Sequence, residues 1–393
     1  MTVTDLPRTA WRPADLERAV SEVETEAARH AESCDREARF PTEALEAMRR
    51  TGLLGLLVPT EDGGPGGGTD DLLAVSNRLS RTCMSVGMIF TMHCQQVAAV
   101  VRDGGPLRER LLPRIVRGEL YLASVTTEAA TGGHLLSSGS SLTASGDTVL
   151  RVDRFAPVVT GGAHADGFLI TALAPDAASP SRLSLVYAER DQLTVTVRGE
   201  WNPMGMRATH SAPLHLTGEI PRDQVIGEHG AFRDIAVRTF APLAHLGWAA
   251  CWQGAADGAL QRVVTLLRAE RHRRDLDSPL LLTRLSRARQ RLDTVHALIR
   301  HAASVLDSAE DVTSAPVQLL VNAVKLTASE LCPAAAEELT DLVGMRHGYL
   351  RDSPTGLERT LRDLRSAPLN YSNDRLHAAD GVLTLMDREV RHV

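Results

Sequence analysis

The period of the sequence changes twice, and this limits the folds open to the chain. Residues 1–119 and 230–393 repeat apolar positions at helical spacing, with charged residues between them. Residues 120–229 instead contain short alternating runs, rich in β-branched side chains and separated by turn residues. We therefore predict an α+β fold that is mostly α. Over these ranges it should have an N-terminal helical domain, a middle β-barrel-like domain and a C-terminal four-helix bundle.

Local signals predict where several elements begin and end. Pro41-Thr42 should open a helix that Gly52 ends, and the five glycines between positions 63 and 68 predict a loop. A mostly apolar stretch at 72–105 predicts a pair of buried helices. Four later stretches are expected to form the helices of the bundle, namely 244–274, 279–307, 316–344 and 372–393.

Composition excludes several classes of protein. The formal net charge of −6 argues against general nucleic-acid binding, because phosphate contacts depend on clustered lysine and arginine. The five cysteines form no CxxC pair and are expected to be reduced, and no His, Cys or Asp cluster has the spacing of a metal site. The first residues lack the order of a signal peptide, and no apolar run is expected to reach the ~18 residues of a membrane span. We therefore expect a cytoplasmic protein without membrane contact.

Four segments carry motifs whose order is informative. They read GLLGLLVPTEDGGPGGG (52–68), ASVTTEAATGG (123–133), RFAPVVTGGAHADGFLI (154–170) and WNPMGMRATHSAPLHLTGEIPRDQVIGEHG (201–230). On these motifs the chain resembles the acyl-CoA dehydrogenase superfamily over nearly its whole length. The fourth segment is the most specific, since its matching positions include Met206, Arg207, Pro221, Gly227 and Gly230. Members of that family bind FAD between the β domain and the helical bundle.

The resemblance implies FAD as cofactor and names the residues that would hold it. Thr127 and Glu128 match a segment that meets the flavin, while Val158 stands where the family has a tryptophan. Arg271 would reach the FAD pyrophosphate of a neighbouring subunit, and Gly344 belongs to a loop near the adenine that here lacks its glutamine. The full set of implied cofactor-binding residues is Thr126, Thr127, Gly132, Gly133, Val158, Thr160, Arg271 and Gly344.

Three residues are candidates for the substrate pocket. His93 follows an apolar stretch where the family's cavity is walled, and it either lines that cavity or is a satisfied core histidine. Arg207 belongs to the fourth motif. His245 is next to Ala244, a position where some family members keep their catalytic glutamate, and it is either a pocket residue or a packed helix residue.

The expected catalytic base is missing from its usual loop. Family dehydrogenases remove a proton next to a thioester carbonyl, and a glutamate about nine residues after an Arg-Asp pair acts as base. Counting from Arg362-Asp363 reaches Tyr371, and aligning the tyrosines reaches Ser372, neither of which is a carboxylate. Asp374 is the nearest carboxylate and is either a substitute base or the cap of the next helix.

Three hypotheses follow for the activity. We place first a dehydrogenase of acyl thioesters, bound to coenzyme A or to a carrier protein, that passes electrons to an acceptor. The alternatives are a flavin monooxygenase that uses reduced flavin and O₂, and an inactive subunit that completes another chain's FAD site. The resemblance also implies a homodimer or tetramer, or a hetero-oligomer with a homologous subunit.

Overall fold

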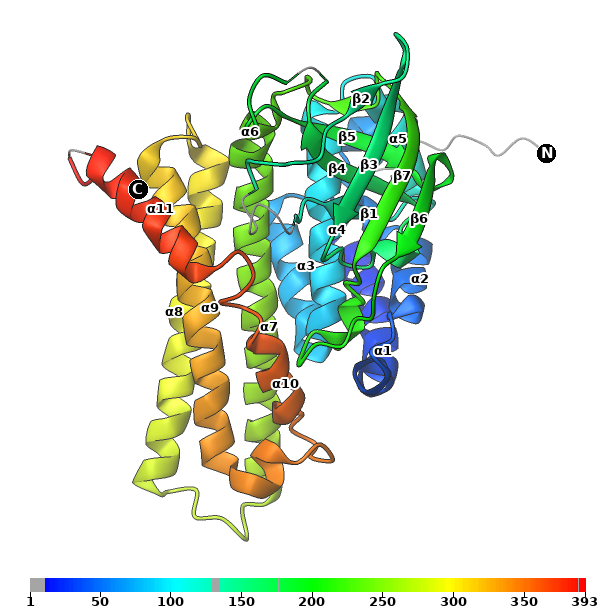
Figure 1. Ribbon diagram of the computed structural model, residues 1–393. Coiled ribbons are helices and arrows are strands. Elements are labelled where there is room, and N and C mark those ends of the chain that lie inside the picture. Colours follow the sequence, from blue (N-terminus) through cyan, green and yellow to red (C-terminus); the bar gives the residue numbers. More distant parts are fainter. Residues whose placement is uncertain (1–10, 129–134, 176, 388) are drawn as a thin grey trace.

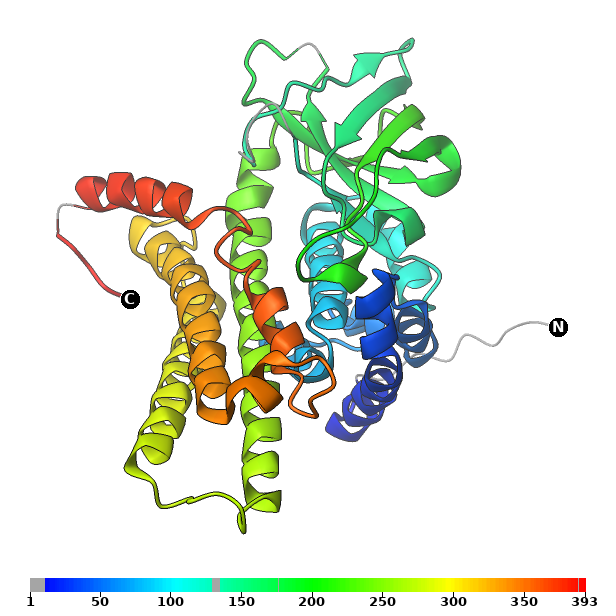
Figure 2. The ribbon, with the colours of Figure 1, turned by 60° about the horizontal axis from the view of Figure 1, so that its bottom comes forward.

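The computed structural model describes residues 11–128, 135–175, 177–387 and 389–393. Helices dominate both ends of this part of the chain, and a sheet domain lies between them in sequence. Figures 1 and 2 show the strands on the same side as α1–α5, with α8, α9 and α11 on the opposite side and α7 between the two groups. The predicted mostly helical α+β fold with a mid-chain sheet domain is confirmed.

The N-terminal helices pack through apolar faces at helical spacing. In α1 (Pro13–Glu37) the buried positions include Ala19, Val20, Val23 and Ala27, which fall on one face. Gly52 ends α2 with a φ of 75°, a left-handed conformation that glycine adopts without strain, as predicted. The remaining helices of this region are α2 (Thr42–Thr51), α3 (Thr69–Thr82), α4 (Met84–Asp103) and α5 (Leu107–Val116).

Helix α4 corrects one expectation from the sequence. It is long and apolar enough to span a membrane by composition alone, so the expectation that no segment reaches that length was wrong. However, 83% of its apolar window is buried inside the protein, which accounts for the lack of charge. Packing within the fold therefore explains the composition of α4.

The middle region forms two four-stranded sheets. One has the order β1-β4-β5-β8 with β1 and β4 parallel, and the other has the order β2-β3-β7-β6 with all pairs antiparallel. Strand β3 alternates between exposed and buried residues, whereas β4 and β5 are buried almost throughout. The strands are β1 (Leu122–Val125), β2 (Thr143–Ala144), β3 (Val149–Ala156), β4 (Gly167–Leu173), β5 (Leu183–Glu189), β6 (Leu193–Val197), β7 (Leu214–Pro221) and β8 (Val225–Ile226).

Long helix α7 joins the N-terminal helices to the C-terminal ones by close packing. A Cβ atom on Gly254 would lie 2.1 Å from the backbone oxygen of Asn77, and one on Gly258 would lie 2.4 Å from that of Arg81. Only glycine allows α7 and α3 to approach this closely. The C-terminal helices are α6 (Phe232–Ile235), α7 (Ala241–Ala269), α8 (Pro279–Ser308), α9 (Ala315–Gly344), α10 (Leu357–Leu364) and α11 (Asn373–Met386).

The last predicted helix of the bundle is shorter than expected. Helix α11 ends at Met386, and Leu376 is its one buried residue among those described. It leaves the body of the protein at an angle to α9, as Figure 1 shows. Three long helices therefore make up the body of the C-terminal region. The segment from α10 to α11 packs on α7 and α9 and reaches the loop that contains Met204.

Candidate functional site

A cavity of about 330 Å³ lies where loops of the sheet domain meet α4 and the end of α10. This volume falls within the range of about 300–1,000 Å³ that is usual for small-molecule sites. Its lining is mostly apolar, with a few hydroxyls and two guanidinium groups. Residues that define its character are Met88, Val158, Thr160, Trp201, Thr209, Ser211, Arg362, Arg365, Leu369 and Asn370.

One wall of the cavity follows the ends of β1 and β3. The Thr127 hydroxyl donates to the Val158 backbone oxygen at 2.7 Å, which fixes the loop that presents Val158 with 41% of its surface exposed. The buried Arg154 donates to the Thr127 oxygen at 2.9 Å and lies 3.6 Å from Glu128. Thr126 lies half-buried in the same segment, whereas Gly132 and Gly133 are outside the described residues.

A chain of hydroxyl groups continues this wall. The Ser211 hydroxyl donates to the oxygens of Thr209 at 2.8 Å or Thr160 at 3.2 Å, and the Thr209 hydroxyl donates to the Met206 backbone oxygen at 2.8 Å. Each hydroxyl carries one proton. When Ser211 donates to Thr160, the proton of Thr160 has no acceptor among the described residues, so this hydroxyl is then available as a donor to a ligand.

The floor of the cavity is a loop held by α10 and α1. Asp363 is buried, and its carboxylate accepts the Met206 N–H at 2.6 Å, while burial raises the pKa of this carboxyl to about 6. Arg207 donates to the Asp35 backbone oxygen at 2.7 Å and to the Pro203 oxygen at 3.0 Å. Arg207 is therefore placed as a support of the loop, outside the lining of the cavity.

The segment after α10 forms the opposite wall and carries no carboxylate into the cavity. Ser366, Leu369 and Asn370 line it, while Tyr371 and Ser372 do not. Asp374 lies exposed in the first turn of α11, also outside the lining. No described residue that lines the cavity is Asp or Glu.

Lys325, which sequence reasoning missed, holds the end of this segment. It is the only lysine of the chain and is fully buried in α9. Its Nζ donates to the Tyr371 backbone oxygen at 3.0 Å and to Asn373 Oδ1 at 2.6 Å, and burial lowers its pKa to about 8. These bonds fix the chain where Tyr371 adopts a φ of 50°. A single lysine within the apolar stretch VNAVKLTA was the available signal.

The two candidate pocket histidines are both core residues. His93 is fully buried, its Nε2 lies 3.0 Å from the Leu54 oxygen, and its Nδ1 accepts the Leu122 N–H at 3.0 Å. Both ring nitrogens are thus engaged, which leaves none for a ligand. His245 lies 6.0 Å from Tyr371 between ring centroids, and burial together with the charge of Lys325 lowers its pKa to about 3. A histidine of such low basicity is a poor substitute for the missing base.

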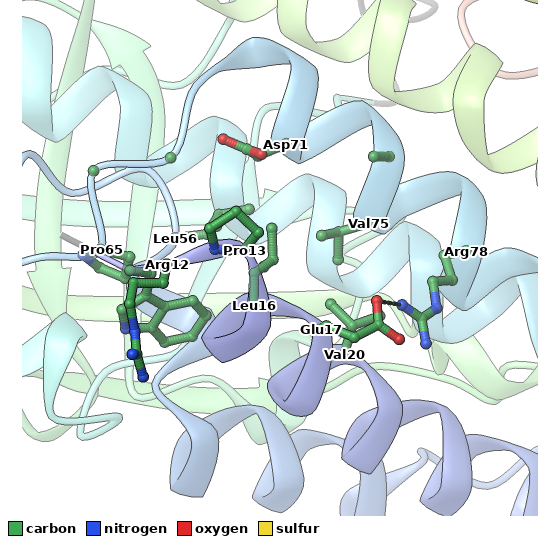
Figure 3. A pocket seen from close by; sticks show the side chains of 14 residues that line it. Arg12, Pro13, Leu16, Glu17, Val20, Leu56, Pro65, Asp71, Val75 and Arg78 are labelled. Atoms are coloured by element: carbon green, nitrogen blue, oxygen red, sulfur yellow. Dashed lines mark hydrogen bonds and ion pairs between the residues drawn. The ribbon is translucent and has the colours of Figure 1, made fainter.

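A larger hollow of about 400 Å³ lies on the N-terminal helices, between α1, the glycine loop and α3 (Figure 3). Its charged groups are engaged inside the protein: Arg78 pairs with Glu17, and Asp71 accepts the Gly68 N–H at 3.0 Å. Arg12, the other arginine of the described lining, is paired with Asp15, so every charged side chain of this lining already has a partner within the protein. We therefore place the functional site at the smaller cavity.

Family models match both ends of the chain. The model described as acyl-CoA dehydrogenase, N-terminal domain, matches residues 15–119, and the one described as acyl-CoA dehydrogenase, C-terminal domain, matches residues 236–369. The chain belongs to the acyl-CoA dehydrogenase superfamily.

Individual relatives are named for different activities. Acryloyl-CoA reductase (NADH) from Anaerotignum propionicum is 25% identical over 92% of this chain and 90% of its own length. Amino sugar nitrososynthase DnmZ from Streptomyces peucetius is 26% identical over 91% and 89%. The crystal structure of FMN-bound TdsC from Paenibacillus sp. A11-2 superposes with a TM-score of 0.84 at 22% identity, covering 95% of this chain and 98% of its own. At that identity the structural match shows the fold alone.

The cavity residues fit the ring of the flavin that this superfamily implies. Thr160 offers a free hydroxyl donor, Val158 offers an apolar surface, and Trp201 adds an aromatic side chain to the same lining. Position 158, where the family has a tryptophan, is a valine here. Trp201, from the fourth motif, places an aromatic side chain in the same cavity. Thr127 does not line the cavity, but its hydroxyl donates to the Val158 backbone oxygen and so holds Val158 in place.

The remaining two cofactor candidates of the superfamily pattern lie together, but at the far end of the bundle. Arg271 is exposed just after α7, and Gly344 ends α9 with a φ of 72°. Glu270 and His347, their neighbours, lie 3.5 Å apart and join these two segments. Figure 1 shows that end of α7 at the bottom, away from the strands. Within one chain these two residues are therefore not part of the cavity.

Among the described residues, no group of His, Cys, Asp and Glu side chains is arranged to hold a metal ion. The five cysteines are free and buried.

Proposed function

We propose that this chain is a flavin-dependent monooxygenase that works with reduced flavin and O₂. The observation that carries the proposal is the absence of Asp and Glu from the described lining of the cavity. A monooxygenase needs no base over a carbon next to a thioester, so this lining is sufficient for it. Relatives named as a nitrososynthase and as a dibenzothiophene monooxygenase support the same assignment.

The dehydrogenase hypothesis, which we placed first from the sequence, has less support from the geometry. It needs a carboxylate over the reacting carbon. Asp363 is buried and its carboxylate is bonded to Met206 N–H, while Asp374 is exposed on α11. One relative is named as an acryloyl-CoA reductase, which supports the dehydrogenase hypothesis, so the experiment below tests both.

The residues of the cavity have separable tasks in this proposal. Thr160 would donate to the flavin ring, while Val158 and Trp201 would cover it and exclude water from the reaction. A bound reduced flavin would supply the activation of O₂. Asn370 and Ser366 face the same space and would orient the substrate by hydrogen bonds.

The cofactor and the assembly of subunits belong to the same proposal. We propose that the flavin is FAD, bound between the subunits of a homodimer or tetramer. Arg271 and Gly344 would contact the FAD of a neighbouring subunit. Residues 1–119, 120–229 and 230–393 would be its three domains, and the cytoplasm its location. Flavin release followed by mass spectrometry separates FAD from FMN, and sedimentation gives the oligomer.

The deciding experiment compares two routes of flavin reduction. The purified flavoprotein is mixed anaerobically with acyl-CoA esters of several chain lengths, and its absorption near 450 nm is followed. We expect no bleaching by any thioester. With NADH, a flavin reductase and ¹⁸O₂, we expect label from O₂ in the product of a substrate found by screening.

The variant Asp374→Asn separates the hypotheses further. If Asp374 were the base of a dehydrogenase, thioester-dependent bleaching would be present in the native protein and lost in the variant. Such a pair of results would refute the monooxygenase proposal. A native protein that purifies without flavin, and takes it up only with a homologous chain, would instead support the inactive-subunit hypothesis.

A further inference from the structure

The charges around the cavity do not balance, and the imbalance lies at Arg365. Arg362, the other lining arginine, is paired on both sides: its guanidinium lies 2.6 Å from Asp35 and 2.6 Å from Glu358. Glu358 in turn lies 3.3 Å from Arg351. Two cations and two anions make this group neutral.

Arg365 has no such compensation. It follows α10, it is exposed, and it lines the cavity. Within the part of the chain that the structure describes, no side chain forms an ion pair or hydrogen bond with it. The buried carboxylate of Asp363 is occupied by Met206 N–H, and the charges that act on it are those of Arg359, Asp35 and Arg362.

We infer that the substrate carries an oxyanion, a phosphate or a carboxylate, that binds Arg365. A guanidinium group presents its donors in a fork that matches the oxygens of either group. Ser366 and Asn370, which line the cavity on the same segment, add a hydroxyl and an amide for the remaining oxygens. A neutral aromatic substrate would make no use of this cation and would leave it to solvent water. The ligand is called a substrate because of the proposed function. Its binding to Arg365 can be measured without any reaction.

The test uses pairs of probes in which one member carries an anionic group that the other lacks. ADP and adenosine form one pair, and indole-3-carboxylate and indole form the other. Binding to the oxidised, flavin-loaded protein is measured by titration calorimetry at low and at moderate salt, without reductase. We expect the anion of at least one pair to bind at least about tenfold more tightly than its neutral partner. The pair that shows this difference identifies the anion as phosphate or carboxylate.

Variants then assign the preference to one side chain. Arg365→Gln should reduce it to less than about threefold, and Arg365→Lys should keep part of it, because the charge remains while the fork is lost. Arg375→Gln is the matched control: it removes the same charge from the first turn of α11, outside the lining, and should leave the preference unchanged.

Three results would overturn the inference. Equal binding of anion and neutral partner by the native protein is one. An unchanged preference in Arg365→Gln is another. Loss of flavin from Arg365→Gln together with the preference is the third, since it would assign Arg365 to the cofactor. A failure of the monooxygenase proposal changes none of these readouts, because no reaction is measured.

Discussion

The chain's only lysine allows a direct test of the electrostatics behind the cavity. Lys325 is fully buried, and burial lowers its pKa from 10.5 to about 8. Between these two values the unfolded chain binds the proton more strongly than the folded one, so stability rises with pH in that window. The gap corresponds to about 3 kcal/mol of destabilisation at neutral pH, of which about 2 kcal/mol should be recovered by pH 9.5.

Two measurements check this value. Protein labelled with ¹³C only at lysine has a single side-chain Cε signal, and we expect its titration midpoint near pH 8. Lys325→Met removes the charge at similar volume, so the difference in unfolding free energy between native protein and variant should shift by about 2 kcal/mol from pH 7 to pH 9.5. Asn373→Ala removes an acceptor 2.6 Å from Nζ and should lower the midpoint further. A midpoint near 10.5, or a stability difference that does not change with pH, would refute the reasoning.

Substitutions at three further positions test the packing that shapes the site. Asp363→Ala leaves the buried Met206 N–H without an acceptor and should cost about 1–3 kcal/mol in chemical unfolding, while Asp363→Asn keeps an acceptor and should cost less; equal losses would contradict this account. Gly254→Ala places a Cβ 2.1 Å from the Asn77 oxygen and should destabilise by about 1–3 kcal/mol, and an unchanged melting temperature would show that α3 and α7 can separate freely. His93→Ala leaves two buried backbone partners unpaired and should lower stability by about 2 kcal/mol or more, with flavin content per folded chain unchanged; loss of flavin alone would return His93 to the cavity.

The sequence predicted the parts of the fold that local signals determine. The end of α2 at Gly52 and the alternation of β3 follow from backbone preference and from the period of burial, which neighbouring residues carry. The two π-helical turns, Ala236–Phe240 and Met345–Tyr349, were not predicted, and neither was the short strand β8. Tertiary packing determines π-helical turns and very short strands, and no local sequence pattern predicts them.

Motifs marked only a part of the cavity. They drew attention to Val158 and Thr160, which line it, and to the base position, which holds no carboxylate. His93 and Arg207 were candidates for the pocket by position, with a core role left open for His93. The structure shows that both ring nitrogens of His93 are engaged by backbone groups, and that Arg207 donates to backbone oxygens and to Asn202. Lys325 and Trp201 were missed because their roles arise from segments far apart in sequence, which periodicity cannot bring together.

The support of the cavity floor by α10 has a consequence for anyone who wishes to redirect the enzyme. Arg362 joins α10 to α1 through Asp35 and to the sheet domain through the Met204 oxygen at 3.0 Å. Substitution of Arg362 breaks these contacts and leaves Asp35 without its partner, so we expect a library at this position to lose stability. Leu369 lines the same cavity and is 67% exposed, so its side chain contributes little to the packing of the fold. Substitutions intended to change substrate specificity should therefore be made at Leu369, with Arg362 kept.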